Sequence, residues 1–267
     1  LVGSEMCIRD SIKGEHMFYD IGAMQMNSTP SLMLFALLCG TACGVVGALF
    51  RKGSQWAESH KPTGRSLMWQ MPIAGLVTGL VSIVVPQVMG NGRAAAQLGF
   101  STFIPETADT SDAAQSAASA AASPWTFLAG SDGAPGSVVN AGTPLELNRL
   151  WMLLGVLALT FVAKALVTLM TIRSGASGGV LQPGIALGST LGTMLGLLWL
   201  FVFPVDSVTA CALIGAAALL SASQQAPLMA MCLVMELTEA PFEFFVPVGM
   251  AVAASAFVSS GLLHRLG

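Results

Sequence analysis

The segment at residues 174–184, SGASGGVLQPG, has the residue types and spacing of an ion-binding element. It is a run of small residues closed by Pro183, and an apolar helix is expected to follow it. The first backbone N–H groups of a helix have no partner inside the helix and lie at the positive end of its dipole, so they can hold an anion. In lipid, irregular backbone of this kind persists only where it lines a cavity or pathway. The segment therefore predicts an anion site.

The composition of the chain places that segment in a membrane. Of the 267 residues, 54% are hydrophobic and only 9% are charged, whereas soluble domains carry about 25% charge. The net charge is −3 and there is no basic cluster, so no nucleic-acid partner is expected. Six apolar stretches predict an all-α, polytopic membrane protein: 32–50, 67–89, 150–172, 184–203, 207–237 and 242–263.

Glycine and proline positions add detail to these stretches. Four glycines repeat every four residues from Gly184 to Gly196, and we interpret them as a ridge for close helix packing. The stretch at 207–237 contains SASQQAP, in which Pro227 would break a simple spanning helix. We therefore predict two half-helices that meet inside the protein.

The distribution of charge predicts an orientation and an insertion. Arg51, Lys52, Lys61 and Arg65 are expected in a short cytoplasmic loop after the first apolar stretch. No Lys or Arg occurs at 94–148, a tract rich in Ala, Ser, Gly and Pro, which is expected on the other side of the membrane. Its part at about 101–146 is interpreted as an inserted low-complexity loop.

Lys164 lies near the middle of an apolar stretch, where an isolated cation would cost about 2.5 to 3.5 kcal/mol. It must therefore have a partner or face water. Either it lies beside the anion route, or it bonds carbonyls at broken helix ends; we favour the second. Four cysteines in apolar stretches suit buried thiols better than a disulfide framework or a metal site: Cys39, Cys43, Cys211 and Cys232.

Two of these segments resemble one known family. SGASGGVLQPGIALGSTLGTMLG is similar to the chloride-binding segment of the CLC chloride channels and proton-coupled chloride exchangers, and LIGAAALLSASQQAPLMAMCLVMELTE is similar to a later stretch of that family. The resemblance covers about residues 20–263 apart from the inserted loop. It implies the second of two inverted repeats of broken, tilted helices, in a homodimer whose subunits each have an anion pathway.

The resemblance also implies the site residues. In the family, the motif Gly-x-Phe-x-Pro offers two successive amides to the central chloride, and here the amides of Val180 and Leu181 take that place. Leu181 stands where the family usually has phenylalanine, which keeps the amide and changes the apolar wall. The candidate anion site comprises Ser177, Gly178, Gly179, Val180, Leu181, Gln182 and Pro183.

Three further family elements are not found in this sequence. They are a Gly-Ser-Gly-Ile-Pro segment, a Gly-Arg-Glu-Gly-Pro segment and a pathway tyrosine near the C-terminus. In the family, the first gives a serine to the anion, the second a gating and proton-carrying glutamate, and the third closes the inner end of the site. We therefore expect residues 12–267 to be a partial transmembrane domain, and residues 1–11, LVGSEMCIRDS, to be translated sequencing adaptor.

The function expected from the resemblance is chloride transport, either as a channel or as a proton/chloride antiporter. Chloride is the transported ion, no cofactor or metal is expected, and protons and the lipid bilayer are further partners. An enzyme is not expected, because the sequence has no constellation of nucleophile, histidine and acid, and the three histidines lie in polar flanks. A bacterial inner membrane is the expected location. Two alternatives stay open: transport of another small anion such as fluoride or nitrate, and a non-conducting membrane subunit that only packs against partners.

Overall fold

The computed structural model describes residues 30–61, 67–85, 96, 147–175, 179–200 and 207–266. Every regular element in these ranges is a helix, which confirms the predicted all-α class. The segment at 1–11 and the inserted loop at about 101–146 lie outside the described residues. The order along the chain is α2 (Pro30–Ser59), α3 (Leu67–Val84), α6 (Leu147–Arg173), α7 (Leu181–Leu200), α8 (Val208–Gln224), α9 (Pro227–Thr238), the 3-10 helix η4 (Phe242–Phe244) and α10 (Phe245–Leu266).

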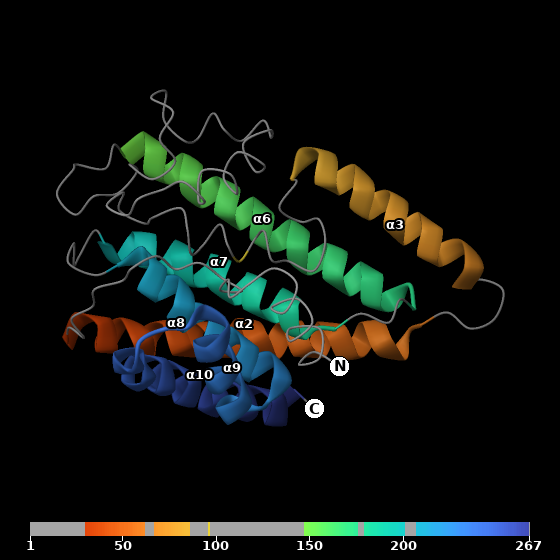
Figure 1. The fold of residues 1–267 in the computed structure, drawn as a ribbon. Helices are drawn as coiled ribbons and strands as arrows, with labels where there is room; N and C mark the ends of the chain where they lie inside the picture. The colour runs from red at the N-terminus through yellow and green to blue at the C-terminus, as the bar shows by residue number, and fades with distance from the viewer. Residues whose placement is uncertain are drawn as a thin grey trace, which may run out of the picture.

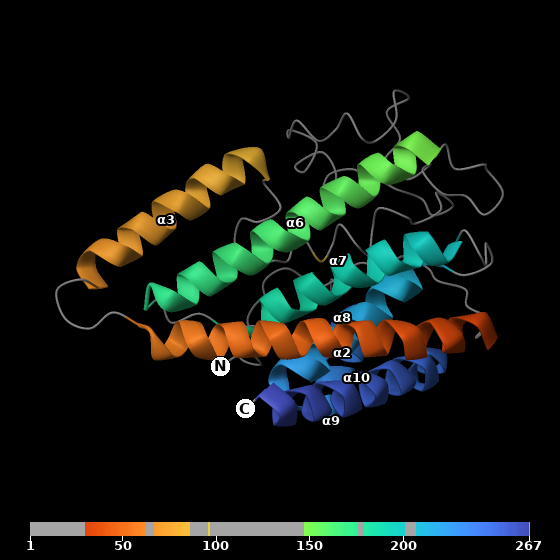
Figure 2. The same ribbon diagram turned by 180° about the vertical axis from the view of Figure 1, so that it is seen from behind.

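Four helical spans in the described ranges are long and apolar enough to cross a membrane. They lie in α2, α6, α7 and the η4–α10 segment, and α3 lies at one edge of the bundle beyond α6 (Figure 1, Figure 2). The helices α2, α6 and α10 finish at the same end of the bundle, and α7 begins on that side (Figure 1). We call this the basic end, because it carries Arg51, Lys52, Lys61, Arg173 and Arg265.

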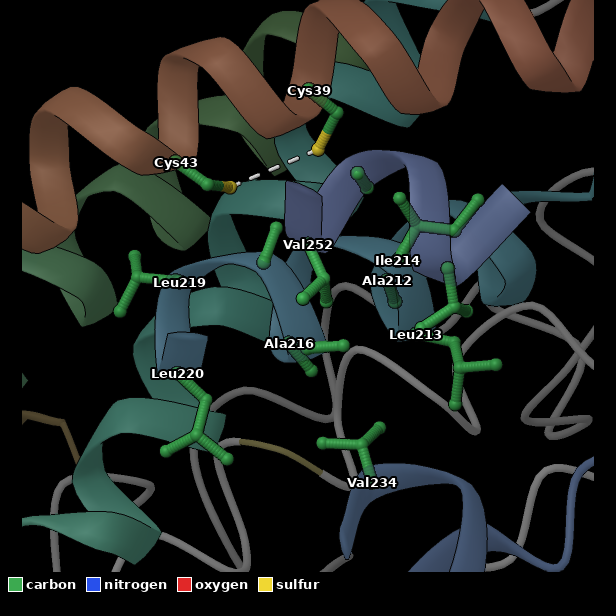
Figure 3. Packing of buried hydrophobic residues seen from close by; sticks show 14 of the residues in the cluster. Cys39, Cys43, Ala212, Leu213, Ile214, Ala216, Leu219, Leu220, Val234 and Val252 are labelled. Atoms are coloured by element: carbon green, nitrogen blue, oxygen red, sulfur yellow. Dashed lines mark hydrogen bonds between the residues drawn. The ribbon is translucent and has the colours of Figure 1, made fainter. Parts of the chain in front are cut away.

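The central helix of the fold is α8. Its sixteen residues at 208–223 are all buried, and it packs against α2, α7, α9 and α10. Figure 3 shows Cys39 and Cys43 of α2 close to this core, with Val234 of α9 and Val252 of α10 on other sides. A helix that is apolar on all sides is expected at such a position.

The glycine ridge of α7 brings two helix backbones together. A Cβ atom added at Gly188 would lie 2.6 Å from the carbonyl oxygen of Gly215, and one added at Gly192 would overlap the carbonyl oxygen of Cys211. At Gly196 the added Cβ would lie 2.6 Å from the Cβ of Cys211. The predicted close packing is therefore confirmed, and α8 contributes Gly215 as the matching small residue.

The glycines of α2 pack against two different helices. A Cβ atom added at Gly40 would lie 2.5 Å from the carbonyl oxygen of Ala251 on α10, and at Gly47 it would overlap the side chain of Ala222 on α8. This face therefore fixes α2 between α8 and α10.

Several helix boundaries differ from the prediction, and two of them concern charged residues or the candidate site. α2 continues to Ser59, so Arg51 and Lys52 lie in a helix and the predicted loop position is wrong. The extra residues include good helix formers, and a helix of 30 residues is about 45 Å long, so its polar end projects beyond the hydrocarbon core. α7 begins at Leu181, before the predicted position 184, because a proline in the first helical turn loses no hydrogen bond.

The predicted break between two half-helices is confirmed at Gln225. This residue has a left-handed φ of 57°, and its N–H donates to the carbonyl of Ser221 at 2.8 Å. Pro227 then begins α9, where its missing N–H is not needed. The chain therefore changes direction at the end of the central helix.

One of the four predicted buried thiols is exposed. Cys39, Cys43 and Cys211 are buried, but Cys232 is exposed on α9, together with Met229 and Glu236. These three residues are spaced by three and four, so they share one outward helix face. An apolar sequence did not distinguish this face, because in a membrane the outside of a bundle is apolar as well.

Candidate anion site

The first turn of α7 is the centre of the candidate anion site. The helix begins at Leu181, and the N–H of Gly184 donates to the carbonyl of Val180 at 3.1 Å. Val180 and Leu181 are the last residue before the helix and its first residue, and their amides have no acceptor inside α7. These two amides therefore stand at the position where a helix N-terminus can hold an anion.

The structure brings five of the seven predicted site residues together in one short segment. Gly179 is exposed, Val180, Leu181 and Gln182 are half-buried, and Pro183 is buried. The other two predicted residues, at positions 177 and 178, lie outside the described residues. The segment thus passes from exposed backbone to a packed helix within five residues.

The turn before the site begins at the end of α6. Gly175 has a left-handed φ of 85°, and its N–H donates to the carbonyl of Ile172 at 3.2 Å. The N–H of Ser174 donates to the carbonyl of Met170 at 2.9 Å. A left-handed glycine after the last helical residues is a common way to end a helix, and glycine adopts this conformation without steric cost.

The end of α8 lies against the beginning of α7. A Cβ atom added at Gly184 would lie 3.2 Å from a methyl carbon of Leu220 and 3.4 Å from the hydroxyl oxygen of Ser223. The Arg51 guanidinium donates to the carbonyl of Ser223 at 3.0 Å, and the side-chain amide of Gln225 donates to the carbonyl of Ala222 at 2.9 Å. These two side chains satisfy carbonyls that the end of α8 leaves without helical partners.

Arg51 is the residue next to the site that the sequence interpretation missed. That interpretation used Arg51 only as a sign of orientation and placed it in a loop. Gly40, Gly44, Gly47 and Arg51 are spaced by four, three and four residues, so they share one face of α2. This spacing would have placed Arg51 on the packed face of α2 if the helix had been extended beyond residue 50, although it does not say which helix Arg51 meets.

Lys164 is buried in α6, with 4% of its surface exposed, and it is not without an interaction partner. Its carbonyl also accepts the hydroxyl of Thr168 at 2.8 Å. Both interpretations of this lysine, beside the anion route or bonded within the protein, stay predictions.

Comparison with known proteins assigns this arrangement to a family. Residues 2–260 match the family described as "Voltage gated chloride channel". The chain belongs to this chloride channel family. The resemblance predicted from residues 174–196 and 213–239 is thus confirmed, and together with the apolar helices it makes the chain part of an integral membrane protein.

A solved structure shares the fold of this family member. It is described as an X-ray crystal structure of a slow cyanobacterial Cl−/H+ antiporter, and the two structures superpose with a TM-score of 0.67 at 19% sequence identity. The match covers 98% of this chain and 53% of the antiporter chain. The chain therefore spans about half the length of that antiporter.

Proposed function

We propose that the complete protein carrying this chain moves chloride across a membrane, and that this chain supplies half of the ion pathway in each subunit. The observation that carries the proposal is that α7 begins at Leu181, which places the amides of Val180 and Leu181 at a helix N-terminus, where N–H groups have no acceptor inside the helix. Membership of the chloride channel family supports chloride as the ion.

Neutral amides suit an ion that must leave as readily as it enters. A backbone N–H replaces part of the hydration shell of the anion without adding a full opposite charge. The half-buried side chain of Leu181 forms an apolar wall next to these donors. Transport in this proposal makes and breaks no covalent bond, so the protein acts without enzymatic activity and without a cofactor besides the ion it moves.

The proposed transport has two modes that use the same anion site. Passive flow needs a continuous electrostatic path, whereas antiport also needs a proton carrier coupled to the anion. The antiporter with the shared fold favours protons as the second substrate. We propose a bacterial inner membrane as the location.

We further propose a homodimer that forms through the outward faces of α2, α9 and α10. These faces carry large exposed apolar side chains, of which Leu228 is 75% and Phe257 82% exposed. The complete protein should run as a dimer in size-exclusion chromatography with light scattering. A monomer in every detergent tried would contradict this assignment.

Flux in liposomes tests the transport proposal directly. The complete protein is reconstituted, and chloride and pH electrodes record efflux in the same cell. Chloride efflux with opposed proton movement shows antiport, and chloride efflux alone shows a channel. Strong flux of fluoride or nitrate with little chloride would replace chloride by another small anion. No flux from a folded dimer would favour the non-conducting packing subunit.

Removing one amide tests the site itself. An α-hydroxy acid in place of Leu181 turns the preceding peptide bond into an ester and removes only the N–H donor. We expect chloride affinity to fall about tenfold, because the donor lost here is one that bonds an ion. The same replacement at Leu195, inside α7, removes an N–H that bonds within the helix and serves as the matched control. Equal chloride affinity in both esters would contradict the site.

A further inference from the structure

A cavity of about 170 Å³ lies where α2, α7 and α8 meet. Its lining includes Arg51, Gln55 and Glu58 of α2, Val180 before α7, and Ser223 and Gln224 of α8. A water molecule takes about 30 Å³ in the liquid, so the cavity has room for a small ion and several waters.

The charges around the cavity favour an anion. Arg51 is one of the residues that line the cavity. Its guanidinium has five N–H donors, one of which bonds the carbonyl of Ser223, another lining residue, at 3.0 Å. Glu58 carries the opposing charge, but its carboxylate lies 3.8 Å from the ammonium of Lys61, and both side chains are exposed. Solvent and this cation therefore weaken the repulsion between the carboxylate and an anion without removing it, whereas the half-buried Arg51 keeps a fixed position.

The cavity touches the candidate anion site through Val180. This residue lines the cavity, and its amide is one of the two predicted chloride ligands. Arg51 is held in place by the end of α8, which itself packs against Gly184 in the first turn of α7. An anion in the cavity is therefore next to the backbone that would bind it during transport.

We propose that this cavity is a second anion site, at which a small inorganic anion such as chloride stops on its way to or from the first turn of α7. The Arg51 guanidinium holds the ion, with the side-chain amides of Gln55 and Gln224 as further donors. This inference rests on the proposed chloride transport. It adds a residue of α2 and the end of α8 to the ion pathway.

Equilibrium binding and flux test this site in the complete protein. Arg51→Met should bind one chloride fewer per subunit in equilibrium dialysis with radioactive chloride. It should also raise the KM for chloride supplied at the basic end by about tenfold, with an unchanged maximal rate, because a charged donor is lost. Lys52→Met is the matched control: it removes the same charge one residue away, from a side chain that does not line the cavity. Wild-type binding and KM in Arg51→Met would overturn the inference.

A second variant covers the case in which Arg51→Met does not fold. Glu58→Gln changes only an exposed residue and removes the negative charge from the cavity, so chloride should bind about two- to threefold more tightly. Unchanged or weaker affinity would contradict the site. The transport proposal and the cavity site can be contradicted by different results. If the wild type binds chloride without flux, the proposed transport fails, while the ion lost in Arg51→Met still supports the cavity site.

Discussion

The helix pairs α7–α8 and α3–α6 both carry glycines at helical spacing, and they use them differently. On α7, Cβ atoms added at Gly188 or Gly192 would collide with the backbone of α8. On α3, Cβ atoms added at Gly75 or Gly79 would meet nothing within 4 Å. The same spacing therefore marks a closely packed face in one pair and an open face in the other.

The two pairs differ in the residues that face the glycines from the neighbouring helix. Gly215 and the small residues around it let the backbone of α7 approach α8, so dispersion contacts accumulate along the whole crossing. α3 packs mainly against α6, where Val81 of α3 and Val85 just after it meet Val167. Trp69 and Ile83 of α3 are more than 70% exposed. No described residue approaches the glycine face of α3, so spacing alone does not show which faces are packed.

The largest expected effect comes from filling the glycine ridge. Gly192→Leu should abolish the folded protein, because a leucine cannot fit against the carbonyl of Cys211. Gly79→Leu should give wild-type yield, since its side chain enters open space. Monodispersity in fluorescence-detected size-exclusion chromatography measures both. A folded Gly192→Leu protein would show that α7 and α8 can move apart. It would contradict the difference between a closely packed and an open glycine face.

Lys164 tests α6, which packs against α3 and against α7. Lys164→Met keeps the aliphatic stem and removes the buried charge, which should lower the free energy of unfolding by about 1 to 3 kcal/mol through the loss of its partner. Chloride flux per folded protein should stay unchanged. Thermal unfolding in detergent and liposome flux measure the two quantities. Reduced flux with full stability would instead place Lys164 beside the anion route.

Substitution by alanine should lower stability at one buried serine and should not lower it at another. Ser259 accepts a hydrogen bond from the Gln225 side chain at 3.0 Å, so Ser259→Ala should cost about 1 kcal/mol. The buried hydroxyl of Ser221 has no hydrogen-bond partner among the described residues, so Ser221→Ala should leave stability unchanged or slightly raised. Unfolding temperatures measured in parallel decide this. A large loss in Ser221→Ala would show that its hydroxyl is bonded in the complete protein.

The smallest effect is expected where α6 meets the exposed end of α2. The Arg173 guanidinium lies 5.5 Å from the centre of the Trp56 ring, an arrangement worth about 0.5 to 1 kcal/mol at an exposed site. Arg173→Met should lower the free energy of unfolding by that amount. Trp56→Leu should cost less in the Arg173→Met protein than in the wild type, because the contact is already lost there. A double-mutant cycle of unfolding temperatures measures the coupling. Zero coupling would reduce the contact to chance proximity.

Local patterns were sufficient for much of this protein. The apolar stretches predicted the helices, and Pro227 with the preceding glutamines predicted the break after α8, because proline and helix ends act on neighbouring residues. The helix N-terminus after SGASGGVLQPG was predicted in the same way, since it is a property of a few consecutive residues, whereas the candidate anion residues 177–183 came from the family resemblance and stay a prediction.

The partners across helices depended on the tertiary structure. Arg51 bonds the end of α8, 172 residues later in the chain. A pattern of neighbouring residues cannot predict a contact between residues so far apart in the sequence. The same holds for the open glycines of α3 and for the exposed Cys232, whose surroundings depend on which helices pack against them. In a membrane protein both the core and the outer surface are apolar, so hydropathy predicts which segments are helical, and only packing decides which of their faces are buried.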